Sequence, residues 1–122
     1  MNYITTLSEW LHVELEKALG GDAIVFPLAL KKEVDGAYVL CDDFDVQREV
    51  TKDGTYPVSI SARVLVVDKS LTTAEELADT VETVLLDGVV PGMGDIEVAS
   101  RRPDFDANTG EYVEEIRLTI NL

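Results

Sequence analysis

The chain has 122 residues, a length that suits one domain built around one hydrophobic core. Its 10 basic residues stand against 24 acidic ones, so the formal net charge is −14. A surface of that sign repels phosphate groups and anionic lipid, which argues against nucleic-acid and membrane binding. We therefore expect a single domain over residues 1–122 that binds neither nucleic acid nor membrane.

The sequence carries no signal of export or of membrane insertion. Residues 1–5 lack the basic and apolar segments of a secretory signal. No apolar run approaches the roughly 20 residues that a membrane-spanning helix needs. Cys41 is the one cysteine, so no disulfide can form within the chain. We expect a soluble protein that is made in the cytoplasm.

A first amphipathic helix is predicted over residues 6–19. Thr6 and Glu9 have the spacing of a capping box, in which two side chains satisfy exposed N–H groups at a helix start. Gly20 and Gly21 end the pattern. The apolar residues recur at helical intervals on one face: Leu7, Trp10, Leu11, Leu15 and Ala18.

A second amphipathic helix is predicted to begin at residue 72 or 73. Thr72 and Glu75 have capping-box spacing, and so do Thr73 and Glu76, which leaves both starts open. The apolar stripe consists of Ala74, Leu77, Ala78, Val81 and Leu85. The opposite face is acidic and carries Glu75, Glu76, Asp79 and Glu82. Residues 89–94, with one proline and two glycines, are predicted to form a mobile loop.

Several further segments are predicted to form strands. Residues 23–30 are apolar but contain Pro27, which favours an edge strand or an extended segment leading into the sheet. Residues 37–41 predict a strand that continues into residues 44–51. A strand over residues 95–99 completes this group.

A hairpin turn is predicted at Asp53 and Gly54, a pair that tolerates the positive φ angles of a type I′ turn. The return strand alternates with a period of two, with its apolar positions at Tyr56, Val58, Ile60, Ala62, Val64 and Val66. Over residues 65–67 both faces become apolar, so we expect that end of the strand to be covered on both sides.

The last strand is predicted over residues 112–122, after a turn at residues 106–110. One of its faces presents Tyr112, Glu114, Ile116, Leu118 and Ile120. The order of elements is helix, three or four strands, helix, two strands. It predicts an α+β fold, with a mainly antiparallel sheet of about four to five strands and two helices packed on one face.

The sequence shows no catalytic or cofactor-binding motif. His12 is the one histidine, and neither it nor Cys41 lies in the pattern of an activated nucleophile. Glycine-rich loops that bind nucleotide phosphates are absent. Residues 104–115 match several ligand positions of a calcium loop, but Thr109 stands where its sharp turn requires glycine. We expect no enzyme activity, no metal and no cofactor.

Two charged segments are the candidate interaction surface. Asp42, Asp43 and Asp45 cluster where two strand segments meet. They could hold a cation, although a solvated loop or bulge explains the same residues. Arg101 and Arg102 could pair with carboxylates of a neighbouring subunit or with a peptide, or could simply end a strand in solvent.

Three segments carry a resemblance to a known family: the helix at residues 6–19, the long strand that runs into a helix over residues 57–81, and the closing hairpin around residues 110–113. In type and order they resemble the tail completion or tail terminator proteins of long-tailed phages. The resemblance implies a phage or prophage structural protein whose copies close into a ring at the end of the tail tube. That ring stops tube polymerisation and forms the surface on which the head docks.

The resemblance also implies the partners. These are other copies of the chain in a ring, with a hexamer as the size considered, and the tail tube and head–tail connector proteins. The protein would reside in the host cytoplasm during assembly and then in the virion tail. Carboxylates of the second helix, or of Asp42, Asp43 and Asp45, would repel DNA if they faced the bore. The alternative is a stand-alone acidic binding module, either a DNA mimic or a small-ligand carrier.

Overall fold

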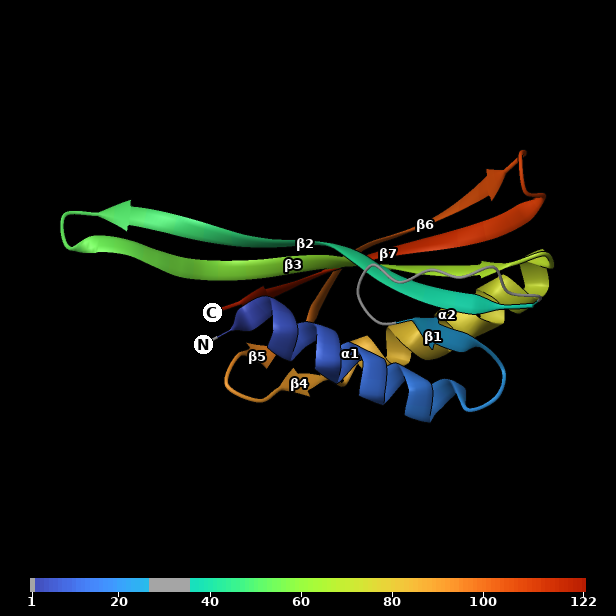
Figure 1. Cartoon of the computed structure of the whole chain (residues 1–122), viewed down its shortest axis with the longest axis horizontal. Helices are drawn as coiled ribbons and strands as arrows, with labels where there is room; N and C mark the ends of the chain where they lie inside the picture. Colours follow the sequence, from blue (N-terminus) through green and yellow to red (C-terminus); the bar gives the residue numbers. More distant parts are fainter. Residues whose placement is uncertain (1, 27–35) are drawn as a thin grey trace.

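Two helices cover one face of a five-stranded sheet in the computed structural model, which describes residues 2–26 and 36–122 (Figure 1). The helices are α1 (Tyr3–Leu19) and α2 (Leu71–Leu86). The strands are β1 (Ile24–Phe26), β2 (Tyr38–Thr51), β3 (Gly54–Asp68), β4 (Val89–Val90), β5 (Gly94–Asp95), β6 (Glu97–Asp106) and β7 (Glu111–Asn121).

The main sheet has the order β1-β2-β3-β7-β6, and a separate two-stranded sheet consists of β4 and β5. Only β1 and β2 run parallel in the described part of the main sheet, while its other neighbours are antiparallel. The predicted α+β class, with two helices on one face of a mainly antiparallel sheet, is therefore confirmed. Neither described helix is long and apolar enough to cross a membrane.

Both helices begin earlier than predicted. α1 starts at Tyr3, and the N–H of Thr6 already donates to the Asn2 carbonyl, so Thr6 cannot be the cap. α2 is capped by Ser70, whose Oγ accepts a hydrogen bond from the Thr73 N–H at 3.3 Å. The predicted capping boxes at both helices are wrong, because a nearby residue already occupies the cap position in each case.

The core lies between the helices and the sheet. The α2 stripe is buried as predicted, and in α1 the leucines are buried, whereas Trp10 is half-buried and Ala18 is exposed. The sheet contributes residues that alternate along its two central strands. They are Ile60, Ala62, Val64 and Val66 from β3 and Ile116, Leu118 and Ile120 from β7.

A second, smaller apolar cluster confirms that the end of β3 is covered on both sides. Val67 is 3% exposed and belongs to a cluster with Phe26 and Tyr38, whose rings meet edge to face at 5.9 Å. β1 lies at the sheet edge, as the proline in its segment indicated. The rest of that predicted segment, residues 27–30, lies outside the described residues.

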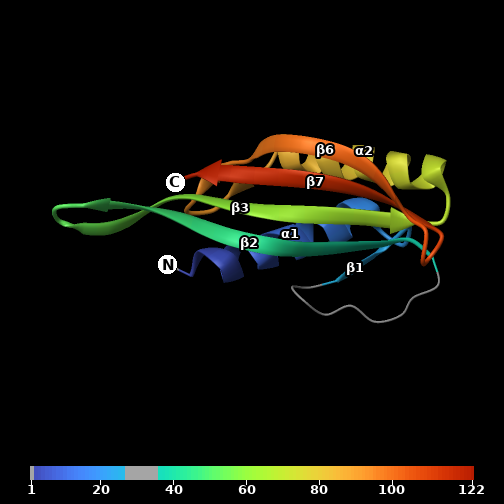
Figure 2. The ribbon, with the colours of Figure 1, turned by 90° about the horizontal axis from the view of Figure 1, so that it is seen from above.

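The hairpin of β2 and β3 extends past the rest of the sheet (Figures 1 and 2). Within the described residues, β7 pairs with β3 only from Ser59 onward, and β1 pairs with β2 only at Tyr38, Val39 and Leu40. All residues over 47–56 are exposed. We call residues 46–58 the hairpin arm.

The arm corrects two details of the prediction. Thr51 pairs with Gly54, so Lys52 and Asp53 form the centre of the turn. Of these turn residues, Gly54 alone has a positive φ, of 136°, which is inconsistent with a type I′ turn. The alternating residue Tyr56 is 49% exposed because the core ends before the arm begins.

The segment after α2 is more ordered than predicted. The expected loop at residues 89–94 forms the short hairpin of β4 and β5, and Val90 is fully buried in the main core. The strand expected at residues 95–99 begins at Glu97 and continues to Asp106. Its turn into β7 lies where the turn chemistry placed it.

Candidate functional site

The sheet face away from the helices carries a cluster of paired charges. Arg63 on β3 donates from Nε and Nη2 to the two carboxylate oxygens of Asp42 on β2, each at 2.7 Å. Arg63 also lies 3.8 Å from the Glu115 carboxylate on β7. The hydrogen bond with Asp42 raises the pKa of Arg63. This bidentate geometry fixes the two strands to each other through their side chains.

A bulge in β2 brings Asp43 into the same cluster. The pairing with β3 shifts between Asp42 and Asp45, and Asp43 has a φ of 55°. Arg117 on β7 donates to Asp43 at 3.0 Å and to Glu115 at 2.8 Å. The hydrogen bond to Asp43, and after it the bond to Glu115, raises the pKa of Arg117. The bulge therefore aims a carboxylate at an arginine two strands away.

Sequence reasoning located the three aspartates but missed their partners. Asp42 and Asp43 come together with arginines, whereas Asp45 accepts a hydrogen bond from the Gln47 side-chain amide. The alternation of β3 indicates that Arg63 faces away from the core, and this is the sequence feature that could have identified it. Its cross-strand partner depends on register, which the one-dimensional pattern does not contain.

The two predicted arginines lie on opposite faces of β6. Arg101 faces α2 and donates to Asp79 at 2.6 Å and to the Glu75 carbonyl at 3.2 Å. It also lies 3.6 Å from Glu114, which is only 4% exposed. Burial lowers the pKa of Arg101, but the hydrogen bond to Asp79 and the charge of Glu114 outweigh it, so the pKa is raised.

These contacts of Arg101 connect β6 to α2 and to β7. Its other carboxylate neighbour, Glu82, lies at 4.0 Å. Arg102 is exposed and forms no ion pair within residues 2–26 and 36–122. Of the predicted pair, Arg102 is the one whose guanidinium remains open to a partner.

The other candidate chemical groups lie apart from these clusters. His12 pairs with Glu16 at 2.9 Å on the exposed side of α1. Cys41 is buried, and burial together with the charge of Asp42 raises its pKa to about 12. The thiol is thus protonated at neutral pH. Among the described residues, no group of three or more His, Cys, Asp or Glu could hold a metal ion.

A hollow of ≈ 390 Å³ lies beside the charged cluster, under the β6–β7 turn. Figure 1 shows this hairpin rising from the sheet on the side away from the helices. We call the hollow the end hollow, and its lining residues are Arg63, Leu65, Asp104, Phe105, Asp106, Ala107, Val113 and Glu115. Phe105 is 50% exposed and packs on Tyr112 with ring centroids 4.8 Å apart.

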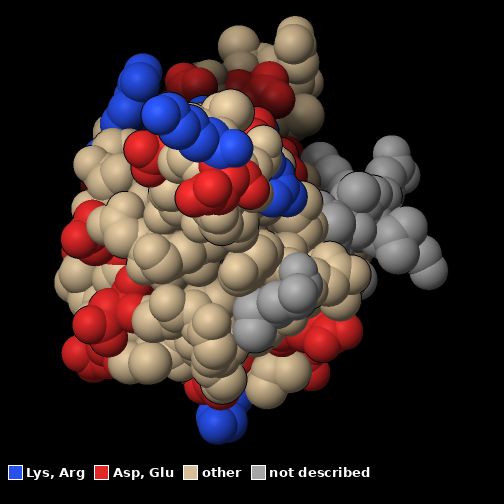
Figure 3. All heavy atoms as spheres, turned by 90° about the vertical axis from the view of Figure 1, so that its left-hand side faces the viewer, with Lys and Arg blue, Asp and Glu red and all other residues tan. Residues whose placement is uncertain are grey.

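Charge is distributed unevenly between the arm and the rest of the molecule. The arm holds two basic residues, Arg48 and Lys52, and two acidic ones, Glu49 and Asp53, so its net charge is zero. The remainder therefore carries the whole −14. Viewed from the arm's side, Lys and Arg gather with Asp and Glu at the top, while the flanks show Asp and Glu among uncharged residues (Figure 3).

Comparison with known proteins gives a match in structure but not in sequence. No protein-family model and no curated protein sequence matches the chain. Among solved structures, a chain from the virion of a native gene transfer agent (GTA) particle superposes with a TM-score of 0.68. It is 13% identical, and the match covers 95% of this chain and 92% of that one. At this identity the likeness shows a shared fold.

Proposed function

We propose that the chain is a structural subunit of a phage-like virion. In particular, it is a tail completion or terminator subunit that caps the tail tube and forms the head–tail joining surface by closing into a ring. It has no cofactor and no catalytic turnover in this role. The observation that supports the proposal most is the fold shared with a gene transfer agent virion chain over nearly the full length of both.

The hairpin arm supports assembly with other subunits. Apart from the Val58 carbonyl, which accepts a hydrogen bond from the Leu122 N–H, its strands have free backbone edges within the described part of the chain. Exposed strand edges are ready sites for pairing with another chain. It also exposes Val50 by 79% and Tyr56 by 49%, on opposite faces of the hairpin, because Val50 pairs with Thr55 and Tyr56 pairs with Glu49. An isolated protomer gains nothing from extending these groups into water, whereas an interface can bury them.

A DNA passage through the ring would need free carboxylates on its wall. Asp42 and Asp43 are neutralised by arginines, so they suit this role less well than the sequence indicated. Glu75 and Glu76 on α2 are exposed and form no ion pair in the described part of the chain. We propose that this end of α2 faces the passage and repels the phosphates.

Two measurements test this function. Sedimentation velocity and negative-stain imaging of the purified chain, over a range of concentrations, are expected to show one ring-sized species. A gold label on a tagged chain, expressed in cells that make the particle, is expected at one end of the tail. A monomer that binds a basic protein tightly at low salt and never enters particles would instead support the acidic binding module.

A further inference from the structure

We propose that the hairpin arm of one copy docks into the end hollow of the next copy, and that this head-to-tail contact closes the ring. The inference rests on the proposed function and adds the two surfaces that meet. The arm supplies the basic groups Arg48 and Lys52 and the apolar side chains Val50 and Tyr56. The hollow supplies an apolar floor with carboxylates at its rim.

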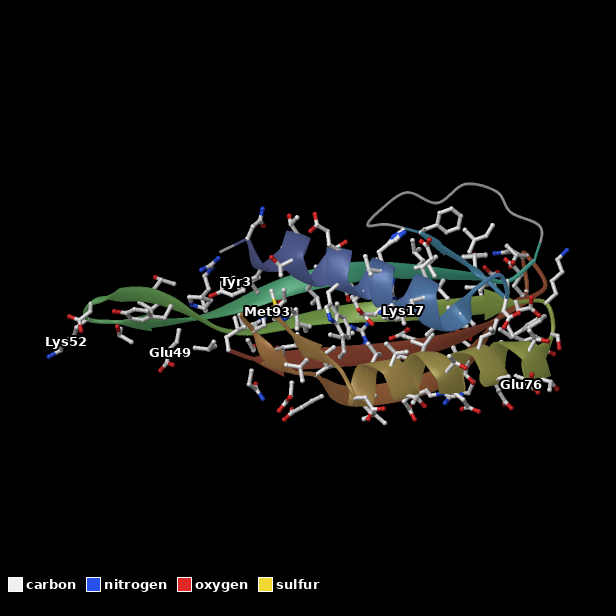
Figure 4. The ribbon with its side chains drawn as sticks, turned by 90° about the horizontal axis from the view of Figure 1, so that it is seen from below. Tyr3, Lys17, Glu49, Lys52, Glu76 and Met93 are labelled. Atoms are coloured by element: carbon white, nitrogen blue, oxygen red, sulfur yellow. The ribbon has the colours of Figure 1, made fainter. Side chains whose placement is uncertain are left out.

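The arm's basic groups are available for a partner. Arg48 and Lys52 are exposed and form no ion pair within the described residues. Figure 4 places Lys52 at the tip of the arm and Glu76 at the opposite end of the molecule. The two arginines of the sheet face, by contrast, already bind carboxylates of their own chain.

Asp104 and Asp106 give the hollow the opposite charge, and the cation that also lines it, Arg63, is already paired with Asp42. Asp104 accepts a hydrogen bond from the Phe105 N–H at 2.8 Å, and Asp106 accepts one from the Asn108 N–H at 2.9 Å. Neither aspartate has a cationic partner among residues 2–26 and 36–122. These hydrogen bonds leave further acceptor capacity on each carboxylate.

The floor of the hollow suits the apolar part of the arm. Leu65 and Val113 line it from the sheet, and the half-exposed ring of Phe105 forms a wall. An aromatic face beside carboxylates favours a guanidinium or ammonium group. The arm presents Arg48 on the same face as the exposed Val50, so this face and the hollow complement each other in both charge and polarity.

Overall charge makes this contact more favourable than others between two copies. Two molecules that each carry −14 repel one another over most of their surfaces. The neutral arm with its two free basic groups approaches an acidic neighbour without that cost. The repulsion between the remaining surfaces thus favours contacts made through the arm.

The placement of the two surfaces gives the contact a direction. The arm and the β6–β7 turn lie at opposite ends of the long axis (Figure 1). An interface between two different patches is heterologous, and it repeats from copy to copy until a rotation closes it into a ring. Each copy in such a ring uses its arm toward one neighbour and its hollow toward the other, and the helix layer takes no part in the contact.

Charge reversal tests the pairing. The arm variant is Arg48→Glu with Lys52→Glu, and the hollow variant is Asp104→Lys with Asp106→Lys. In sedimentation velocity at low salt, each variant alone is expected to associate about tenfold or more weakly than the unmodified chain. An equimolar mixture of the two is expected to regain association, because every arm then meets a hollow of opposite charge.

Matched controls separate this pairing from a change in net charge. Glu9→Lys with Glu97→Lys changes the charge as much as the hollow variant does, and Lys17→Glu with Lys69→Glu matches the arm variant. Circular dichroism checks that every variant folds. In the unmodified chain, a zero-length carbodiimide cross-link is expected between Lys52 and Asp104 or Asp106 of different copies.

The outcomes distinguish this inference from the proposed function. Rings that form equally well with both variants overturn the docking but leave ring assembly intact. If the arm variant loses association while the hollow variant keeps it, the arm binds another surface. If the hollow variant loses association while the arm variant keeps it, another segment of the neighbouring copy fills the hollow. Either result overturns the inference. A chain that remains monomeric and forms no such cross-link removes both.

Discussion

The indole of Trp10 on α1 lies directly against Gly88, the residue that precedes β4. A Cβ atom at position 88 would stand 2.5 Å from Trp10 Cη2 and 3.1 Å from the Cδ1 atom of Ile96. Gly88 has an ordinary backbone conformation, so its role is to leave space for the ring. The contact ties the middle of α1 to the segment that follows α2.

Gly88→Ala is therefore expected to lower the free energy of unfolding by about 1–3 kcal/mol, because the ring must move from a packed position. Urea denaturation measures this change. Gly21→Ala is the control, since a Cβ there meets no atom within 4 Å. In a Trp10→Phe background, which lacks the clashing atoms, Gly88→Ala should cost less. An equal cost in both backgrounds would contradict the steric explanation.

Arg101→Met is expected to destabilise the fold by about 3 kcal/mol, because it leaves the Glu114 carboxylate buried without its cation. The second carboxylate oxygen of Glu114 already has no hydrogen-bond partner within the described residues. Replacing both residues, as Arg101→Met with Glu114→Leu, should recover most of the loss. Denaturant midpoints of the three proteins test this, with the exposed Arg102→Met as the control. A double variant no more stable than Arg101→Met would refute the buried-charge argument.

Ser70→Ala is expected to lower the free energy of unfolding by about 1 kcal/mol, because it removes the side-chain cap of α2. Thr72→Ala removes the residue that sequence spacing favoured as the cap and should change stability by about 0.5 kcal/mol or less. Chemical denaturation of both variants distinguishes the two helix starts. A larger loss of stability from Thr72→Ala than from Ser70→Ala would show that Thr72 caps the helix, as the capping-box spacing predicted.

Cys41 is expected to react slowly with thiol reagents at neutral pH and to make the fold sensitive to alkali. Its pKa is raised from 9.0 to about 12 in the folded state. Above pH 9 the unfolded chain releases the thiol proton while the folded chain retains it. Stability from this group is thus complete below pH 9 and declines up to about pH 12, by at most about 1.4 kcal/mol per pH unit.

Cys41→Val isolates that contribution, because other groups titrate over the same range. The stability difference between the unmodified chain and Cys41→Val is measured at pH 8 and pH 11. It should shift in favour of the variant at the higher pH. A difference that is independent of pH would mean that the thiolate forms equally easily in both states.

Local periodicity was sufficient to predict the class of fold. The 3.6-residue stripe of α2 and the two-residue alternation of β3 depend on which side of an element meets the core, and each pattern is complete within one segment. Ile116, Leu118 and Ile120 of β7 are buried for the same reason, whereas Tyr112 is half-buried. The acidic segment around Asp43 was located as well, since its position depends on composition alone.

The pairings that make up the candidate surfaces depend on contacts between segments far apart in the chain. The bond between Arg63 and Asp42 requires the register of β2 on β3, and the bond between Arg117 and Asp43 requires a bulge as well. Tyr56 continues the alternation of β3, but it is exposed because β7 does not extend that far. A side-chain pattern states which face of a strand is apolar. Whether anything covers that face is a property of the packed molecule.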